Sequence, residues 1–191
     1  MKMSSLEKRF VNSPAHSSRV AARAEQLVRA TDPRPGQQLL DVGCGNGVAA
    51  IQLANTFDLS VTGVDVDAGQ ITAATTAAGR TGVHFLASDA TSLPFPDGKF
   101  DLVYTNKTTH HIPDWERALE EMMRMLKPGG HLIYSDFVAP LGHRLPTRSG
   151  ISRVARQHGL QAVLLQPSFF RQTSIFRAPS DRPGRADAGT I

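Results

Sequence analysis

The sequence predicts an α/β fold with a Rossmann-like doubly wound sheet that is mostly parallel and has an antiparallel last strand. Short apolar runs alternate with helical patterns at short connections, which is typical of parallel strands joined by right-handed crossovers. The first apolar run, 39–42, leads directly into a glycine-rich turn. The last two runs, 160–165 and 173–176, are joined by a linker too short for a helical crossover, so this pair must be antiparallel.

The elements follow one another without an internal repeat. Residues 1–38 read as a leader and a helix, residues 39–178 as the sheet domain, and residues 179–191 lack apolar side chains to pack and are predicted to be a disordered tail. The expected strands cover 39–42, 60–66, 82–87, 100–105, 131–138, 160–165 and 173–176, and the expected helices cover 15–30, 48–54, 68–78, 115–126 and 151–159.

Local signals justify these boundaries. The helix over 15–30 has apolar residues at helical spacing and is stopped by the Asp-Pro-Arg-Pro-Gly segment at 32–36. Asp67 is placed to cap the helix over 68–78. In the helix that begins at Trp115 the apolar residues share one face, and Lys127-Pro128-Gly129-Gly130 is expected to terminate it.

The turn after the first strand has glycine at alternate positions, Gly43, Gly45 and Gly47, and the helical pattern resumes at Val48. Glycine permits positive φ and lets a backbone lie against a ligand. Unpaired N–H groups and the positive end of the helix dipole gather at such a helix start. The turn therefore favours a ligand site, and a tight turn without a ligand is the alternative.

Composition indicates an ordinary globular domain of 191 residues with 40% apolar and 20% charged residues. We expect a cytoplasmic protein, because no run of about 18 apolar residues and no secretory segment occurs. The single cysteine, Cys44, excludes an internal disulfide and a cysteine-based metal cluster, and we expect no metal.

Charge is uneven along the chain, although the net charge is only +4. Residues 39–140 carry twelve Asp and Glu against six Lys and Arg, which suits a cationic cofactor, whereas residues 141–191 carry eight Lys and Arg against two acids. The basic flanks border a mouth that attracts an anionic partner, or they are solvated surface.

Two carboxylates follow strand ends, where ligands of open parallel sheets bind. Asp65 suits a ribose with two free hydroxyls, and Asp89 can accept from the exocyclic amine of adenine. Alternatively, each caps the segment that follows it. NAD is a second cofactor candidate, since residues 45–50 fit G-x-G-x-x-A and Asp65 follows about 20 residues on.

The whole order of signals resembles the class I S-adenosylmethionine-dependent methyltransferase superfamily, within it the small-molecule type related to ubiquinone and menaquinone C-methyltransferases. The segments that carry the resemblance are LLDVGCGNG at 39–47, VTGVDV at 61–66, SDATSLPFPDGKFDLVYTN at 88–106, HHIPD at 110–114 and MLKPGGHLI at 125–133. They are specific for the superfamily and not for a substrate.

The resemblance implies S-adenosyl-L-methionine as the cofactor and a strand order of 3-2-1-4-5-7-6. The glycines would pass under the methionine moiety, and Asp41 would orient its ammonium. Asp65 would hold the ribose hydroxyls, Asp89 with the Ala90 backbone would read adenine, and Asn106 would lie near the sulfonium. The implied cofactor-binding residues are Asp41, Gly43, Gly45, Gly47, Asp65, Val66, Asp89, Ala90 and Asn106.

His110 and His111 follow the fourth strand on the expected substrate side and are the candidate catalytic residues. A histidine there can take a proton from a phenol, an enol or an acidic carbon. His111 occupies the position where the resembled family commonly has histidine, and we favour it over His110. A structural role, bonding the loop backbone, is the alternative for both.

The prediction is therefore a methyltransferase that acts on oxygen or carbon of a small molecule. A D/N-P-P-aromatic turn, typical of methyltransferases for DNA and glutamine amino groups, is replaced by Asn106-Lys107-Thr108-Thr109, which disfavours those substrates. An RNA methyltransferase, favoured only by the basic flanks, and a non-catalytic cofactor-binding partner subunit remain alternatives. Arg9, Phe10, Asn12 and His16 are candidates to close over the cofactor, and residues 140–150 to form the substrate wall.

Overall fold

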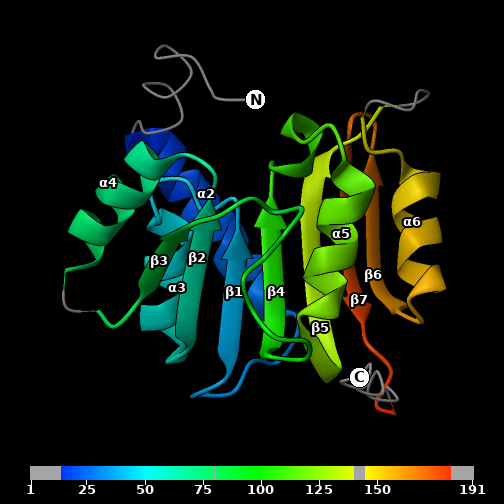
Figure 1. Cartoon of the computed structure of the whole chain (residues 1–191), viewed down its shortest axis with the longest axis horizontal. Coiled ribbons are helices and arrows are strands. Elements are labelled where there is room, and N and C mark those ends of the chain that lie inside the picture. The colour runs from blue at the N-terminus through cyan, green and yellow to red at the C-terminus, as the bar shows by residue number, and fades with distance from the viewer. Residues whose placement is uncertain (1–13, 80, 140–144, 182–191) are drawn as a thin grey trace, which may run out of the picture.

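A computed structural model of the chain describes residues 14–79, 81–139 and 145–181, which form one sheet with helices on both faces (Figure 1). The strands are β1 (Gln38–Val42), β2 (Ser60–Asp65), β3 (His84–Ala87), β4 (Phe100–Asn106), β5 (Leu126–Phe137), β6 (Gln161–Ser168) and β7 (Arg171–Arg177). The helices are α2 (Pro14–Arg29), α3 (Val48–Phe57), α4 (Ala68–Ala78), the 3₁₀ turn η1 (Thr109–His111), α5 (Trp115–Arg124) and α6 (Arg148–Gln157).

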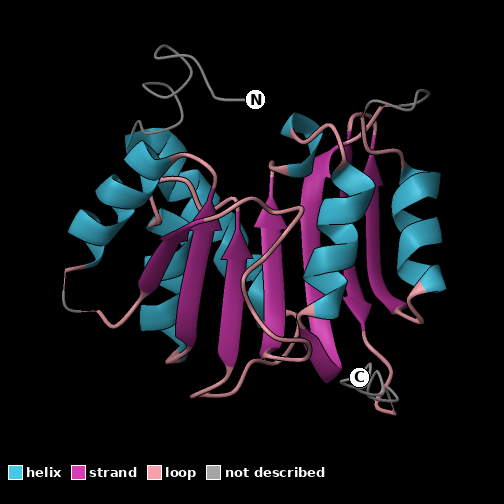
Figure 2. Ribbon diagram, viewed as in Figure 1, coloured by secondary structure: helices cyan, strands magenta, loops and turns pink. Residues whose placement is uncertain are grey.

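The seven strands lie in the order β3-β2-β1-β4-β5-β7-β6, which confirms the predicted order. β1 to β5 are parallel, whereas β7 runs antiparallel to both β5 and β6 (Figure 2). The antiparallel pairing follows from the two-residue connection between β6 and β7, because a parallel pair needs a long crossover. The carboxyl ends of β1 to β5 therefore meet at one edge of the sheet.

The apolar runs are continuous because the sheet is covered on both faces. Successive side chains point to opposite sides, so in β1 Leu39 faces the cluster built with α2 and α3, and Leu40 faces the cluster built with α5. Both leucines are fully buried. Figure 1 shows α5 and α6 in front of the sheet and α2 and α3 behind it.

Helix α2 shares the core of the sheet although it precedes the first strand. Ala24, Leu27 and Val28 are at most 2% exposed and belong to the same apolar cluster as Leu39. The position of the α2 N-terminus brings His16 to the carboxyl edge of the sheet, where it lines a cavity. Residues 1–13 and 182–191, on which most of the predicted leader and tail fall, lie outside the described residues.

The expectation that Lys127 to Gly130 ends a helix was wrong. Helix α5 ends at Arg124, and β5 begins at Leu126. Phe100 pairs with Leu126 and Leu102 pairs with His131, so the Lys-Pro-Gly-Gly segment is an irregularity in the ladder. Gly129 has φ +74, which glycine adopts at little cost.

The predicted cap of α4 is present, and α5 has a cap as well. Oδ1 of Asp67 accepts hydrogen bonds from the N–H groups of Gly69 and Gln70 at 2.9 and 3.3 Å, and thereby caps α4. Asp114 caps α5 by accepting from the N–H of Arg117.

Among the described residues, we find no helix with the length and apolarity needed to cross a membrane.

Candidate active site

A cavity of about 670 Å³ opens at the carboxyl ends of the parallel strands. It includes nine of the residues that the sequence nominates: Gly43, Gly45, Asp65, Val66, Asp89, Ala90, Asn106, His110 and His111. Asp41 and Gly47, nominated with them, do not line it. The cavity therefore gathers residues from the ends of β1, β2, β3 and β4 at one place.

The three glycines of the turn have positive φ values but different surroundings. A Cβ on Gly43 would lie 2.1 Å from Oγ1 of Thr108, and one on Gly47 would lie 2.6 Å from the Phe85 ring. A Cβ on Gly45 would meet no described atom within 4 Å. Gly43 and Gly47 thus permit close packing, whereas Gly45 is the glycine that borders open space.

Asp65 holds the glycine turn in place. Its Oδ2 accepts from the N–H of Gly45 at 2.9 Å, and its Oδ1 accepts from the N–H of Asp67 at 2.9 Å. Each carboxylate oxygen has two lone pairs, so each retains acceptor capacity beside the cavity. The two sequence interpretations of Asp65, as a cap and as a ligand acceptor, are therefore compatible.

Asp89 forms the local bonds that a cap would form. Oδ1 accepts from both the N–H and the Oγ1 of Thr91 at 2.8 Å, and these bonds hold the pKa of the exposed Asp89 carboxyl below its ordinary value. Asp89 and Ala90 also line the cavity. Asp89 therefore bonds the following segment as a cap would and also lines the cavity.

Two polar oxygens in this region have no hydrogen-bond partner among the described residues. One is Oδ1 of Asn106, which lies at the end of β4 and lines the cavity. The other is Oδ2 of Asp41, whose side chain is buried. Burial, and next the charge of Asp65, raise the pKa of Asp41 to about 7. Such atoms are expensive to bury unless a partner satisfies them.

The sequence analysis missed Asp136, which is the most extensively bonded carboxylate of the site. Its side chain is fully buried, and Oδ1 lies 2.6 Å from Nδ1 of His110. Oδ2 accepts from the N–H groups of Thr108 and Thr109 at 3.0 and 2.7 Å. Burial raises the pKa of Asp136, but the bonds from His110 and Thr109 outweigh it, so the pKa lies below its ordinary value.

An ionised Asp136 fixes the tautomer of the His110 ring. A carboxylate can only accept, so Nδ1 of His110 carries a proton, and in the neutral ring Nε2 is the acceptor. The His110 ring also lies 3.9 Å, centroid to centroid, from the ring of His111. The main-chain N–H of His111 donates to the carbonyl of Thr108 at 3.0 Å. Both histidines line the cavity.

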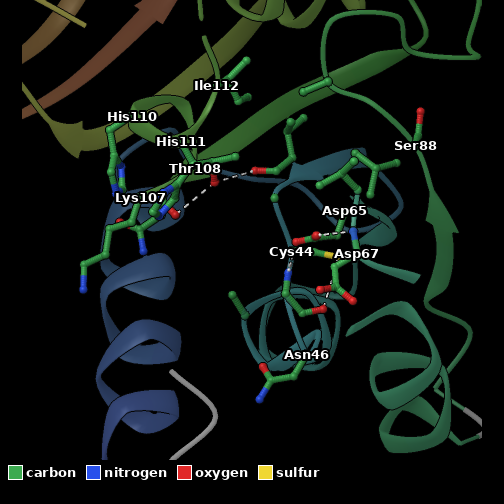
Figure 3. A pocket seen from close by; sticks show the side chains of 18 of the residues that line it. Cys44, Asn46, Asp65, Asp67, Ser88, Lys107, Thr108, His110, His111 and Ile112 are labelled. Atoms are coloured by element: carbon green, nitrogen blue, oxygen red, sulfur yellow. Dashed lines mark hydrogen bonds between the residues drawn. The ribbon is translucent and has the colours of Figure 1, made fainter. Parts of the chain in front are cut away.

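Figure 3 shows the two sides of the cavity. Lys107, Thr108, His110 and His111 lie on one side, and Asp65 with the glycine-turn residue Cys44 lies on the other. Burial is the main cause that raises the pKa of the Cys44 thiol, which disfavours the reactive thiolate. The two histidines, the candidate proton acceptors, therefore lie on the opposite side of the cavity from Cys44 of the glycine turn.

Other lining residues come from outside the ends of β1 to β4 or follow β4 directly. His16 comes from α2 and Phe137 from the end of β5, and Lys107 follows β4 directly. Among the residues nominated with His16 to close the site, Arg9, Phe10 and Asn12 lie outside the described part of the chain, as do residues 140–144 of the nominated substrate wall. The strand-end rule that nominated Asp65 would also have nominated Asp136, one residue before β5 ends.

Sequence comparison matches residues 40–134 to a family described as "Methyltransferase domain". The 27-O-demethylrifamycin SV methyltransferase of Amycolatopsis mediterranei is 39% identical over 109 residues, which are 55% of this chain and 40% of that protein. The O-methyltransferase rstn1 of Aspergillus nomiae is 34% identical over 169 residues, 83% of this chain and 72% of that protein. The chain thus spans from under half to about three quarters of these relatives.

Structural comparison gives the same fold. A SAM-dependent methyltransferase from Aquifex aeolicus superposes with a TM-score of 0.74 at 19% identity, over 92% of this chain and 99% of that one. At this level of identity the similarity concerns the fold alone. The sequence relatives carry the assignment beyond the fold, because one of them is matched over 72% of its length at 34% identity.

Proposed function

We propose that this chain, which belongs to the class I S-adenosylmethionine-dependent methyltransferases, transfers the methyl group of that cofactor to a hydroxyl oxygen of a small molecule. The observation that carries the proposal is the bond of His110 to Asp136, with His110 on the side of the cavity opposite Cys44 of the glycine turn (Figure 3). Transfer to an acidic carbon would use the same pair. Relatives named O-methyltransferases favour oxygen.

Two features of the structure fit the cofactor. Gly45 leaves open space where a side chain would stand, so the backbone can lie against a ligand. Asn106 lines the cavity, and its buried Oδ1 has no hydrogen-bond partner among the described residues. In this proposal Asp65 accepts from the ribose hydroxyls, Asp89 and the Ala90 backbone contact the adenine, and Gly43, Gly45 and Val66 line its path.

In this proposal Asp41 and Gly47 act indirectly, because neither residue lines the cavity. Gly47 lets α3 approach Phe85 closely and so sets the position of the turn. The buried carboxylate of Asp41 acts on the cofactor ammonium through an intervening water or through its charge, since Asp41 does not itself line the cavity. Both residues thus support the proposed cofactor site without contacting the cofactor.

When bound, S-adenosylmethionine supplies a methyl group on a positively charged sulfur, so the leaving group is already activated. The protein then has to align the acceptor and remove its proton. Alignment of two reactants is worth roughly 7–11 kcal/mol when their geometry is close to that of the transition state. Nε2 of His110 accepts the hydroxyl proton as the carbon–oxygen bond forms and the carbon–sulfur bond breaks, and Asp136 stabilises the imidazolium that results.

The first experiment is calorimetric titration of the chain with S-adenosylmethionine and, separately, with NAD. We expect micromolar binding of S-adenosylmethionine that weakens at least tenfold in Asp65→Ala. Asp97→Ala is the matched control, because Asp97 is an exposed carboxylate paired with Arg124 and is not part of the cavity lining. Binding of NAD in place of S-adenosylmethionine would overturn the proposal.

The second experiment tests turnover. Protein with radiolabelled S-adenosylmethionine is incubated with a panel of phenols, enols and hydroxylated polyketides, and label in the organic phase is counted. Transfer to an acceptor that has a free hydroxyl, and not to its methyl ether, supports the proposal. Tight cofactor binding without transfer to any acceptor would instead favour the non-catalytic partner subunit.

A further inference from the structure

Two cationic side chains flank one aromatic ring at the edge of the cavity. Phe137, the last residue of β5, lines the cavity and is 43% exposed. Nζ of Lys107 lies 6.0 Å and Cζ of Arg171 lies 5.4 Å from the centroid of its ring. Arg171 is there because it is the register partner of Phe137 across the antiparallel β5–β7 pair.

The positive charge at this place is not neutralised within the described structure. Burial is the main cause that lowers the pKa of Lys107, and the charges of Arg171 and Arg19 lower it further, against the opposing effect of Asp136. Among residues 14–79, 81–139 and 145–181, none of Lys107, Arg171 and Arg19 forms an ion pair with a carboxylate. We call Lys107 and Arg171, the two cations that flank Phe137, the cationic cluster.

The backbone holds Lys107 in an unusual conformation. Its φ is +55, in the left-handed region that costs a non-glycine residue about 1–2 kcal/mol. The N–H of Lys107 donates to the carbonyl of Ser135 at 2.9 Å, which fixes this conformation at the end of β4. Backbone strain of this kind concentrates at functional sites. The conformation directs a lysine to the cavity at a position where a glycine would be strain-free.

Packing alone gives a weak reason for this arrangement. A cation over an aromatic ring at an exposed site contributes about 0.5–1 kcal/mol, and like charges that converge on one ring repel each other. An anion bound between them would remove the repulsion and gain charge-assisted hydrogen bonds of about 1.5–3 kcal/mol each.

We propose that the cationic cluster is a substrate subsite that holds a carboxylate or phosphate group of the methyl acceptor, with the apolar part of the acceptor against Phe137. This rests on the proposed function. The centroids of the His110 and Phe137 rings lie 5.2 Å apart in an edge-to-face arrangement, so the subsite and the base border the same ring. The acceptor is therefore an anionic amphipathic molecule whose charged group lies a few bonds from its reacting hydroxyl.

The alternative occupant of the cluster is the carboxylate of the cofactor itself. Lys107 directly follows Asn106, which the proposed function places near the methionine part, so this alternative has to be separated by experiment. Arg171 is the residue that distinguishes them, because it stands on β7, which is separated from β1 and its glycine turn by two strands, β4 and β5.

The test is an NMR titration of ¹⁵N-labelled protein with inorganic phosphate and, separately, with acetate. Sodium chloride at matched ionic strength is the reference, and each titration is run with and without saturating S-adenosylhomocysteine. The amides of Lys107, Phe137 and Arg171 report on the site. We expect saturable shifts with millimolar affinity that persist when S-adenosylhomocysteine is bound. The tighter of the two anions identifies the group that the subsite prefers.

Arg171→Gln should weaken the binding of the preferred anion at least fivefold and leave the affinity for S-adenosylhomocysteine unchanged. Arg177→Gln is the matched control, since Arg177 lies at the other end of β7, opposite His131, and should leave both affinities unchanged. Shifts equal to those in chloride, equal anion binding in Arg171→Gln, or loss of anion binding when S-adenosylhomocysteine is added would each overturn the inference.

The same data separate this inference from the proposed function. S-adenosylhomocysteine that binds while phosphate and acetate do not overturns the subsite and leaves the cofactor assignment standing. Anion binding that depends on Arg171 in a protein that does not bind S-adenosylhomocysteine overturns the proposed function instead, and with it the assignment of the anion to a methyl acceptor.

Discussion

Nδ1 of His110 lies 2.6 Å from Oδ1 of Asp136, and Oδ2 of the same carboxylate holds the backbone N–H groups of Thr108 and Thr109. One buried carboxylate thus fixes both the imidazole ring and the loop that carries it. His110 follows β4 and Asp136 is the last residue but one of the neighbouring β5, and the pairing of Asn106 with Ser135 brings these two strand ends together. The geometry of the proposed base therefore depends on the register of β4 and β5.

His110→Ala is expected to lower kcat by about 10²-fold or more, because general base catalysis typically contributes that much. The affinity for S-adenosylmethionine should change less than twofold, since His110 acts on the acceptor. Single-turnover kinetics with an acceptor identified by the label-transfer screen measure the first quantity, and calorimetry measures the second. His110→Ala with unchanged turnover would remove His110 from the mechanism.

His111→Ala separates the two histidines. The sequence favoured His111 as the base, whereas the structure gives the buried carboxylate to His110. We expect His111→Ala to lower kcat by less than tenfold, because His110 is the histidine whose Nδ1 lies 2.6 Å from the buried carboxylate of Asp136. A larger loss in His111→Ala than in His110→Ala would restore the order that the sequence suggested.

Asp136→Asn is expected to destabilise the protein by about 3 kcal/mol, because an amide nitrogen or a neutral oxygen would replace an anion that accepts several N–H bonds. Urea unfolding at pH 7 measures this. Asp97→Asn, which removes an exposed ion pair with Arg124, should cost less than about 1 kcal/mol.

The stability difference between the wild type and Asp136→Asn should change with pH in one direction. The pKa of Asp136 is lowered in the folded protein, so the stability it contributes is present above the pKa of an unfolded aspartate, about 4, and is lost as the pH falls through the lower folded value. The stability gap between the wild type and Asp136→Asn should therefore narrow below about pH 4. A gap that is constant between pH 7 and pH 3 would contradict the assignment.

Gly45→Ala and Gly47→Ala are expected to act on different properties. Both carry the cost of a positive φ, about 1–2 kcal/mol. A Cβ on Gly47 would also stand 2.6 Å from the Phe85 ring, so we expect a further loss of about 1–3 kcal/mol of folding free energy. A Cβ on Gly45 would enter open space, so Gly45→Ala should weaken cofactor binding at least tenfold.

Thermal unfolding and calorimetric titration of the two glycine variants check this contrast. The prediction fails if Gly45→Ala binds S-adenosylmethionine as tightly as the wild type, because open space at Gly45 would then not be the space that the cofactor uses. It fails equally if Gly47→Ala is no less stable than Gly45→Ala.

Most of the fold could be predicted because its signals are local. Asp67 caps α4 as expected, and the short connection between β6 and β7 leaves only antiparallel pairing. The start of β5 was missed because Lys-Pro-Gly-Gly is a typical helix terminator, while its actual role depends on the pairing of Phe100 with Leu126. That pairing is between distant residues and leaves no local mark in the sequence.

The residues of the site also divide into those that a local sequence signal indicates and those that depend on the pairing of distant strands. Asp65 and Asn106 could be nominated from their places at strand ends. The contact between His110 and Asp136 could not, since it requires the register of β4 on β5. The meeting of Lys107 and Arg171 at Phe137 likewise requires β7 to run antiparallel beside β5. Helical and strand periodicity report which face of an element is buried and carry no information on such pairings.

Asp41→Asn is expected to raise stability and lower cofactor affinity at the same time. Burial and the charge of Asp65 raise the pKa of Asp41 to about 7, so the folded protein prefers a protonated Asp41. Below about pH 4 Asp41 is protonated in both the folded and the unfolded protein, so the wild type has its full stability there. As the pH rises from about 4 to about 7, the unfolded chain loses this proton while the folded protein keeps it, and the stability of the wild type falls. An asparagine carries no charge and keeps its stability over the whole range.

The difference between Asp41→Asn and the wild type should therefore be small near pH 4, grow with rising pH and level off above about pH 7, at up to about 4 kcal/mol in favour of the variant. Urea unfolding between pH 4 and pH 9 without cofactor measures it. Calorimetry at pH 8 should show weaker binding of S-adenosylmethionine, because the ammonium of the cofactor loses the nearby negative charge. A variant that is less stable than the wild type at pH 8 would show that the carboxylate of Asp41 is satisfied in the folded protein without the cofactor.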